Sequence, residues 1–170
     1  MKPIKTITRA EAIFSDDEKH RLYLKKVWNT KLPIATVITK FPRYEGQIKS
    51  DLTTQLIVNN LYDIGMGGFY LVNLFTNVEL SNRMDEVEDI LHEETDKYIL
   101  EAVENSESII LAWGSTSSKI ITNRIKEVET LLAPFEDKIQ LLLNPTTKQI
   151  SHPLNPKSRT FWMIEKRNNR

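Results

Sequence analysis

Residues 34–39 read Ile-Ala-Thr-Val-Ile-Thr, and this run decides the fold because β-branched side chains favour a strand inside a sheet. Pro33 precedes the run, and Pro42 breaks the pattern after it. Leucine and isoleucine recur at helical spacing over residues 51–64. The run Phe69–Phe75 is hydrophobic throughout, as expected for a strand covered on both faces. A strand, a helix and a second strand in one sheet predict a right-handed parallel unit.

The same alternation extends from this unit in both directions. Towards the N-terminus, Ala12–Phe14 and Arg21–Leu24 flank a polar stretch and predict a hairpin. Towards the C-terminus, the pattern predicts a helix that begins at Ser81 or Asn82, a strand over Ser108–Trp113, a helix that ends at Pro134, a strand over Ile139–Leu143 and an edge strand over Thr160–Ile164. We therefore expect a three-layer α/β/α sandwich with a mostly parallel central sheet and an N-terminal antiparallel hairpin. It forms a single α/β domain over residues 1–170, with its core at about 12–165.

The composition excludes several classes of site. The chain has 170 residues and no cysteine, which rules out disulfides, thiolate metal sites and cysteine nucleophiles. Its histidines lie far apart and outside zinc-site spacings, so neither a metal nor a cofactor is expected. No apolar run approaches the roughly 20 residues that span a bilayer, and the basic start lacks a signal-peptide pattern. We expect a cytoplasmic protein with no membrane contact.

The net charge is zero, but the charges are segregated along the chain. Residues 1–49 carry 11 Lys/Arg and 5 Asp/Glu, residues 50–107 carry 2 and 13, and residues 108–170 carry 10 and 5. A fold that brings the two basic ends together would present one basic face to phosphate groups. Two separate solvated surfaces are the plainer interpretation, and the sequence leaves both open.

In open α/β sheets, ligands bind beyond the carboxyl ends of the parallel strands. Those ends fall at residues 39–44, 73–77, 113–117 and 144–155. Asn73 ends an apolar strand with an amide that is equipped to read a base edge, or else to tie down a neighbouring loop. Pro153 and Pro156 bracket a loop that would hold His152 over a pocket, whereas an ordinary surface histidine is the alternative.

A second loop at this edge, Gly114–Lys119, resembles a phosphate-binding loop only faintly because it lacks the second glycine. Its strand–glycine–helix turn would aim free N–H groups at an anion. A plain helix cap is the alternative.

Several short motifs occur in an order that resembles a family of short bacterial and phage proteins known only as a domain of unknown function. They are Ala12–Ser15, Arg21–Leu24 with Trp28, Asp51–Thr53, Val72–Phe75, Ala112–Gly114 and His152–Leu154. The family has an Asn-Pro-Ser turn after the first core strand, which this chain lacks. The resemblance covers about residues 12–165 and implies no activity.

The order of the strand ends is also similar to that of uracil-DNA glycosylases. By that resemblance, Asn73 binds a flipped base and His152 stabilises the negative charge that develops on it. Pro153 and Leu154 would shape the loop that enters the duplex.

The sequence departs from the glycosylase pattern in the turn after the first core strand. Phe41 stands where a polar residue would orient water. Phe41 or Tyr44 would instead stack on a base, while Lys40 and Arg43 contact phosphates. Asp51 is the nearby carboxylate that would activate water, and a helix cap is its alternative role.

The sequence thus predicts a nucleic-acid or nucleotide-binding protein, with hydrolysis of the N-glycosidic bond of a flipped base as its candidate activity. The predicted catalytic residues are Asn73, His152 and Asp51. The predicted substrate-binding residues are Lys40, Phe41, Pro42, Arg43, Tyr44, Trp113, Gly114, Ser115, Pro153, Leu154, Asn155 and Arg159, with Lys157 as a further phosphate contact. One alternative is a non-catalytic interaction protein of a phage or mobile element that binds a protein partner through an acidic helix at 85–107. Another is a nucleotide-processing enzyme that holds Mg²⁺ at Asp51.

Overall fold

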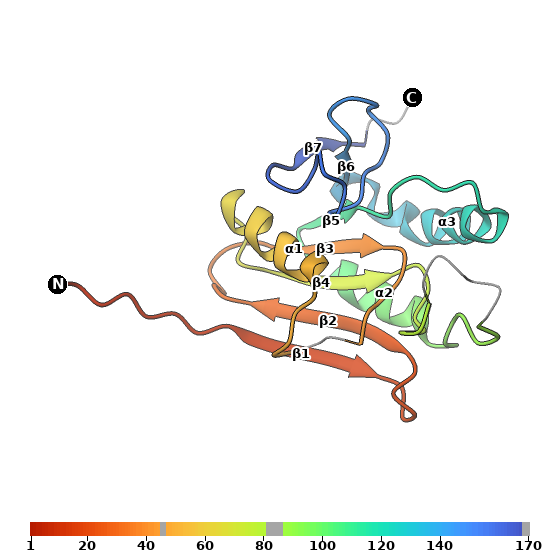
Figure 1. Cartoon of the computed structure of the whole chain (residues 1–170), viewed down its shortest axis with the longest axis horizontal. Coiled ribbons are helices and arrows are strands. Elements are labelled where there is room, and N and C mark those ends of the chain that lie inside the picture. The colour runs from red at the N-terminus through yellow and green to blue at the C-terminus, as the bar shows by residue number, and fades with distance from the viewer. Residues whose placement is uncertain (45–46, 81–86, 168–170) are drawn as a thin grey trace.

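In the computed structural model, the described residues (1–44, 47–80 and 87–167) form one seven-stranded sheet in the order β1-β2-β4-β3-β5-β6-β7 (Figure 1). The strands are β1 (Arg9–Phe14), β2 (Arg21–Val27), β3 (Ile34–Thr39), β4 (Gly68–Asn73), β5 (Ser108–Leu111), β6 (Ile139–Leu143) and β7 (Met163–Lys166). The central strands β4, β3, β5 and β6 are parallel, and the pairs β1–β2, β2–β4 and β6–β7 are antiparallel. The sheet is therefore mixed, with the expected parallel centre and N-terminal hairpin.

Helices cover both faces of this sheet (Figure 1). They are α1 (Leu52–Asp63), α2 (Thr95–Glu104) and α3 (Lys119–Leu132), and α3 continues into a 3₁₀ helix, η2 (Ala133–Lys138). Ile57 and Leu61 of α1 belong to one buried core, whereas Ile99 of α2 and Val128 of α3 belong to a second core. The predicted three-layer α/β/α arrangement is thus present in the described part of the chain. None of the helices described here is long and apolar enough to cross a membrane.

The pairing of β2 with β4 depends on a glycine. A Cβ atom on Gly68 would lie 2.6 Å from the backbone oxygen of Lys26, so the close approach of the two strands excludes any side chain there. The strands pair antiparallel, with Leu24 opposite Leu71. This direction brings the first residue of β2, Arg21, to the carboxyl end of β4.

The long acidic helix predicted from Ser81 or Asn82 is wrong in its extent. Residues 81–86 lie outside the described residues, residues 87–94 are not helical, and α2 begins only at Thr95. The acidic residues of the 85–107 stretch that are described therefore do not share one helix face.

Hydrogen bonds to the end of β4 explain this difference. The backbone N–H of Thr76 donates to the carbonyl of Ile90 at 3.2 Å, and the Thr76 hydroxyl accepts from the N–H of His92 at 2.9 Å. These contacts use backbone groups that a continuous helix would pair within itself.

The last strand is also shifted from the predicted edge strand. It spans Met163–Lys166 and not Thr160–Ile164, because Trp162 turns into the core beside α1 while Phe161 is exposed. Its pairing with β6 places Met163 opposite Leu143.

Candidate functional site

The carboxyl ends of β3 and β5 mark the point where the chain leaves the sheet towards opposite faces. From β3 it continues to α1, and from the neighbouring β5 it continues to α3 on the other side. Such a reversal opens a crevice in an α/β sheet, and a pocket of about 480 Å³ lies here. Ten of the predicted site residues line this pocket: Lys40, Phe41, Arg43, Asp51, Trp113, Gly114, Ser115, His152, Leu154 and Asn155.

The other predicted site residues do not line the pocket: Asn73, Pro42, Tyr44, Pro153 and Arg159. Pro42 and Pro153 are buried, whereas Tyr44 is 60% exposed. Arg159 lies beside the pocket wall, because its Nε donates to the carbonyl of Leu154 at 2.8 Å. Lys157 donates from Nζ to the Thr146 hydroxyl at 3.1 Å.

Asn73 lies under the pocket wall and is only 1% exposed. Its Nδ2 donates to the Thr39 hydroxyl at 2.6 Å, and its Oδ1 accepts from Nη2 of Arg21 at 3.2 Å. Both Thr39 and Arg21 line the pocket. The amide predicted to read a base is thus engaged with two residues of the wall, the last residue of β3 and the first residue of β2.

The loop that carries His152 is fixed to the ends of β5 and β6. The N–H of Ser151 donates to the carbonyl of Leu142 at 2.7 Å, and the N–H of Gly114 donates to the carbonyl of Ser151 at 3.1 Å. Gly114 has a φ of +70°, and a Cβ atom there would lie 3.2 Å from Cβ of His152. Glycine therefore permits both the left-handed turn and the close contact with the histidine.

The contacts of His152 determine which of its ring nitrogens carries a proton. Its Nδ1 accepts the N–H of Leu154 at 3.1 Å, so the neutral ring carries its proton on Nε2. Burial, followed by the nearby charge of Lys40, lowers the pKa of His152 to about 4, although the Asp51 carboxylate opposes the shift. At neutral pH the pocket therefore contains an uncharged imidazole with an N–H to donate.

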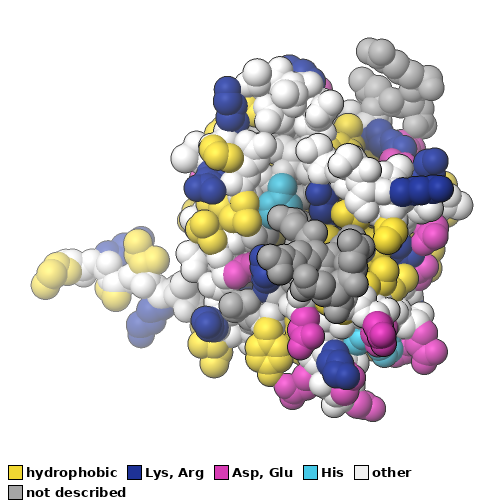
Figure 2. Space-filling model, turned by 45° about the vertical axis from the view of Figure 1, so that its right-hand side comes forward, with side chains coloured by type: hydrophobic (Ala, Val, Ile, Leu, Met, Phe, Trp, Pro, Cys, Tyr) yellow, Lys and Arg dark blue, Asp and Glu magenta, His cyan; other side chains and the backbone are white. Residues whose placement is uncertain are grey.

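Charged side chains surround this histidine. Lys40 donates from Nζ to the carbonyl of Ser115 at 2.6 Å, and burial lowers its pKa. Asp51 caps α1, because its Oδ1 accepts the N–H of Thr54 at 2.8 Å, which is the alternative that the sequence left open. Figure 2 shows Lys and Arg side chains on both sides of a histidine, with a separate group of Asp and Glu below them.

Phe41 does not replace the missing water-orienting residue. Its ring packs against Phe75, with the ring centres 5.7 Å apart, and it belongs to the edge of the core between the sheet and α2. The turn after β3 thus contributes an apolar surface to the pocket.

Sequence reasoning missed Arg21 as a pocket residue. Arg21 is 2% exposed, and besides its bond to Asn73 it donates from Nη1 to the carbonyl of Arg43 at 3.1 Å. A signal was present, because an arginine that opens an apolar strand run is unusual in a core. Its place became predictable only once β2 was known to pair antiparallel with β4.

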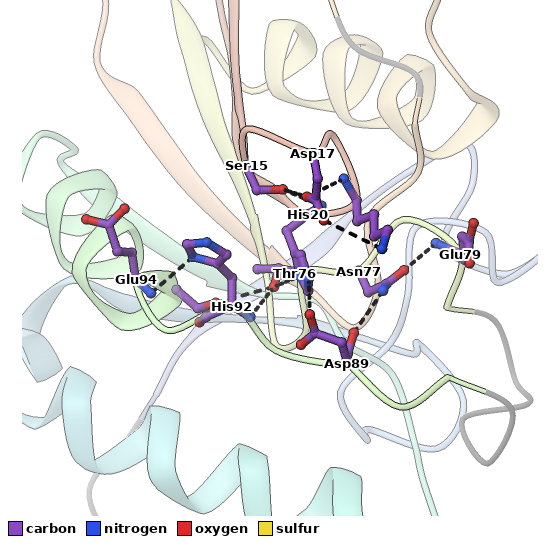
Figure 3. Close-up of polar contacts among 11 residues, drawn as sticks. Ser15, Asp17, His20, Thr76, Asn77, Glu79, Asp89, His92 and Glu94 are labelled. Carbon is purple, nitrogen blue, oxygen red and sulfur yellow. Dashed lines mark hydrogen bonds and ion pairs between the residues drawn. The ribbon is translucent and has the colours of Figure 1, made fainter.

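A second polar cluster lies outside the pocket, between the β1–β2 turn and the segment after β4 (Figure 3). His20 contacts the Thr76 hydroxyl through Nδ1 at 2.9 Å and Oδ2 of Asp89 through Nε2 at 3.0 Å. Thr76 is fully buried and accepts the N–H of His92, so no substrate reaches its hydroxyl. We interpret this cluster as a structural link. Among the described residues, no group of three or more His, Cys, Asp or Glu is arranged to hold a metal ion.

The fold and the pocket define a mixed α/β domain with a polar pocket at the carboxyl edge of its parallel strands. The chain belongs to the family described as "Protein of unknown function (DUF1643)", which matches residues 21–154. This match confirms the expected membership of a domain-of-unknown-function family. Neither the curated proteins nor the solved structures contain a match to the chain. The resemblance to uracil-DNA glycosylases stays a prediction.

Proposed function

We propose that the chain binds a nucleotide, free or within a nucleic acid, in the pocket at the carboxyl ends of β3 and β5. The observation that carries this proposal is the convergence of Arg21, Lys40 and Arg43 with a neutral His152 around a space of about 480 Å³. Lysine and arginine bind phosphate oxygens, and an imidazole N–H donates to a base carbonyl. Asp51 is the only carboxylate among the described lining residues, so positive charge predominates.

Hydrolysis of an N-glycosidic bond is the reaction that we assign to this pocket. When that bond breaks, negative charge develops on the departing base, and Nε2–H of His152 would stabilise it by donation. Asp51 is the candidate for orienting the water, through the carboxylate oxygen that does not cap α1. Reading of a base edge by Asn73 would require its amide to exchange Thr39 or Arg21 for the base.

Binding is tested by fluorescence anisotropy with labelled single-stranded and double-stranded DNA over a series of salt concentrations. Phosphate contacts should give a logarithmic affinity that falls with logarithmic salt by about 0.7 for each single-strand phosphate neutralised. The variant Arg43→Gln should weaken binding and flatten this slope. Lys126→Gln, which removes an exposed charge from α3, is the matched control and should bind like the wild type.

Catalysis is tested separately, by release of free base from oligonucleotides that contain uracil or other modified bases. We expect release that His152→Gln and Asp51→Asn both abolish. Binding without release would restrict the protein to recognition. Absence of binding to DNA and to free nucleotides at low salt would refute the proposal and favour the interaction-protein alternative.

A further inference from the structure

Lys40 lies in the wall of the pocket. It follows β3 directly, and its side chain is half-buried. Its Nζ donates to the carbonyl of Ser115, which is a neutral group. Among the described residues, no Asp or Glu pairs with it, and Arg43 adds a second cation to the same wall.

This environment favours the uncharged form of the amine. Burial lowers the pKa of Lys40, because the charged ammonium loses hydration and no carboxylate of the described residues compensates for the loss. A desolvated lysine near other cations is the environment in which enzymes use the amine as a nucleophile towards carbonyl groups.

The serine and threonine hydroxyls of the pocket are less suited to act as nucleophiles. A serine or threonine needs a general base, but Nδ1 of His152 is occupied by the N–H of Leu154, and its Nε2 already carries the proton. Ser151 is buried and shares a hydrogen bond with Ser158 at 2.7 Å. An amine in its uncharged form needs no such base, and the lowered pKa of Lys40 makes that form easier to reach than in an ordinary lysine, so Lys40 is the candidate nucleophile of this pocket.

We propose that Lys40 forms an imine with the aldehyde of a phosphorylated open-chain sugar bound in this pocket. The proposal shares with the proposed function only the requirement that the pocket accepts a phosphate group, for which Arg43 and Arg21 are the candidate partners. It does not require an intact base or an N-glycosidic bond.

The reaction balances without an oxidant or a reductant. The uncharged nitrogen of Lys40 attacks the carbonyl carbon, the new C–N bond forms, and the carbonyl electron pair moves to oxygen. One proton passes from this nitrogen to that oxygen, which gives a neutral carbinolamine. The hydroxyl group then leaves as water with the second proton of the nitrogen, whose lone pair completes the C=N bond of the imine. Nε2–H of His152 would donate to the oxygen while negative charge develops on it.

The test is reductive trapping on the full chain. The protein is incubated with 2-deoxyribose 5-phosphate and cyanoborohydride, which converts an imine into a stable secondary amine, and the labelled lysine is located by peptide mass spectrometry. We expect an adduct on Lys40 at several times the level on exposed Lys126. Neutral 2-deoxyribose should label Lys40 much less, because it lacks the phosphate.

Two variants complete the test. Lys40→Arg places a guanidinium group, which forms no imine, at the same position, and it should lose the adduct. Lys126→Arg, on α3 and outside the pocket lining, is the matched control and should leave the Lys40 adduct unchanged. Equal labelling of all lysines, or a folded wild type without an adduct on Lys40, overturns the inference. Binding of DNA or of free nucleotides without trapping would refute the imine alone, whereas trapping without binding of either would refute the nucleotide proposal alone.

Discussion

Nη2 of Arg21 lies 3.2 Å from Oδ1 of Asn73, so an amide at the end of β4 holds a guanidinium group in the pocket wall. The two residues are far apart in the sequence and meet because β2 and β4 are antiparallel neighbours. Asn73 also fixes the Thr39 hydroxyl, which places it at the centre of a buried polar network.

The first prediction concerns this network. Asn73→Ala removes the acceptor of Arg21 and the donor to Thr39 in a buried site, and it should lower the free energy of unfolding by about 1–3 kcal/mol. Asn73→Asp keeps the acceptor for Arg21 and replaces the donor to Thr39 by an acceptor for its hydroxyl, so it should lower the free energy of unfolding by less. Urea denaturation measures both values. Equal stability of the alanine variant and the wild type would contradict a structural role for the amide.

The second prediction separates the cap from the charge at Asp51. Asp51→Ala removes the acceptor for the N–H of Thr54 and should destabilise the protein by about 1 kcal/mol. Asp51→Asn retains a capping oxygen and should be nearly as stable as the wild type. Thermal denaturation followed by circular dichroism distinguishes the two variants. If Asp51→Asn lost as much stability as Asp51→Ala, the carboxylate charge, and not the cap, would be what stabilises α1.

The third prediction is a pH dependence that His152 controls. Its pKa is about 4 in the folded chain against 6.5 in the unfolded chain, so the unfolded state binds more protons between these values. The free energy of unfolding should therefore fall as the pH drops through this window, by about 2 kcal/mol from about pH 7.5 to about pH 5. Denaturation of the wild type at both pH values measures this decrease in the free energy of unfolding. His152→Gln should remove the part of the decrease that is due to His152. The same slope in the variant would assign the effect to other groups.

The fourth prediction compares two glycines with similar backbones. Gly114→Ala should cost about 1–2 kcal/mol for its left-handed conformation, and it should also displace His152, whose Cβ lies 3.2 Å from the new methyl group. Gly65 also has a positive φ, of +83°, but no atom lies within 4 Å of the Cβ that an alanine would add. Gly65→Ala should therefore lower the free energy of unfolding through its backbone conformation alone. A loss of ligand affinity in the Gly114 variant and not in the Gly65 variant would locate His152 at the site. Equal affinities would exclude this contact from binding.

Much of the fold was predictable because periodicity is a local property of the chain. The β-branched run of β3 and the apolar run of β4 indicated buried strands, and both strands are buried in the parallel centre of the sheet. The predicted helix is present only from Thr95 among the described residues, and residues 87–94 are not helical because the hydrogen bonds to Thr76 outweigh the local apolar spacing. Of the adjacent aromatic residues Phe161 and Trp162, only Trp162 is buried, and the last strand therefore begins after it, at Met163.

For the site, the sequence by itself determined the edge of the sheet, because parallel strands of an α/β unit end on one side, and residues 39–44, 113–117 and 144–155 supply much of the pocket lining. Only the tertiary structure decided which side chains face the pocket and which are already engaged. Arg21 lies in the pocket wall because β2 and β4 pair antiparallel. The amide of Asn73 is already hydrogen-bonded to its neighbours, and the N–H of Leu154 determines the tautomer of His152. Hydrogen-bond partners and burial depend on residues that are distant in the chain, and burial lowers the pKa of both Lys40 and His152.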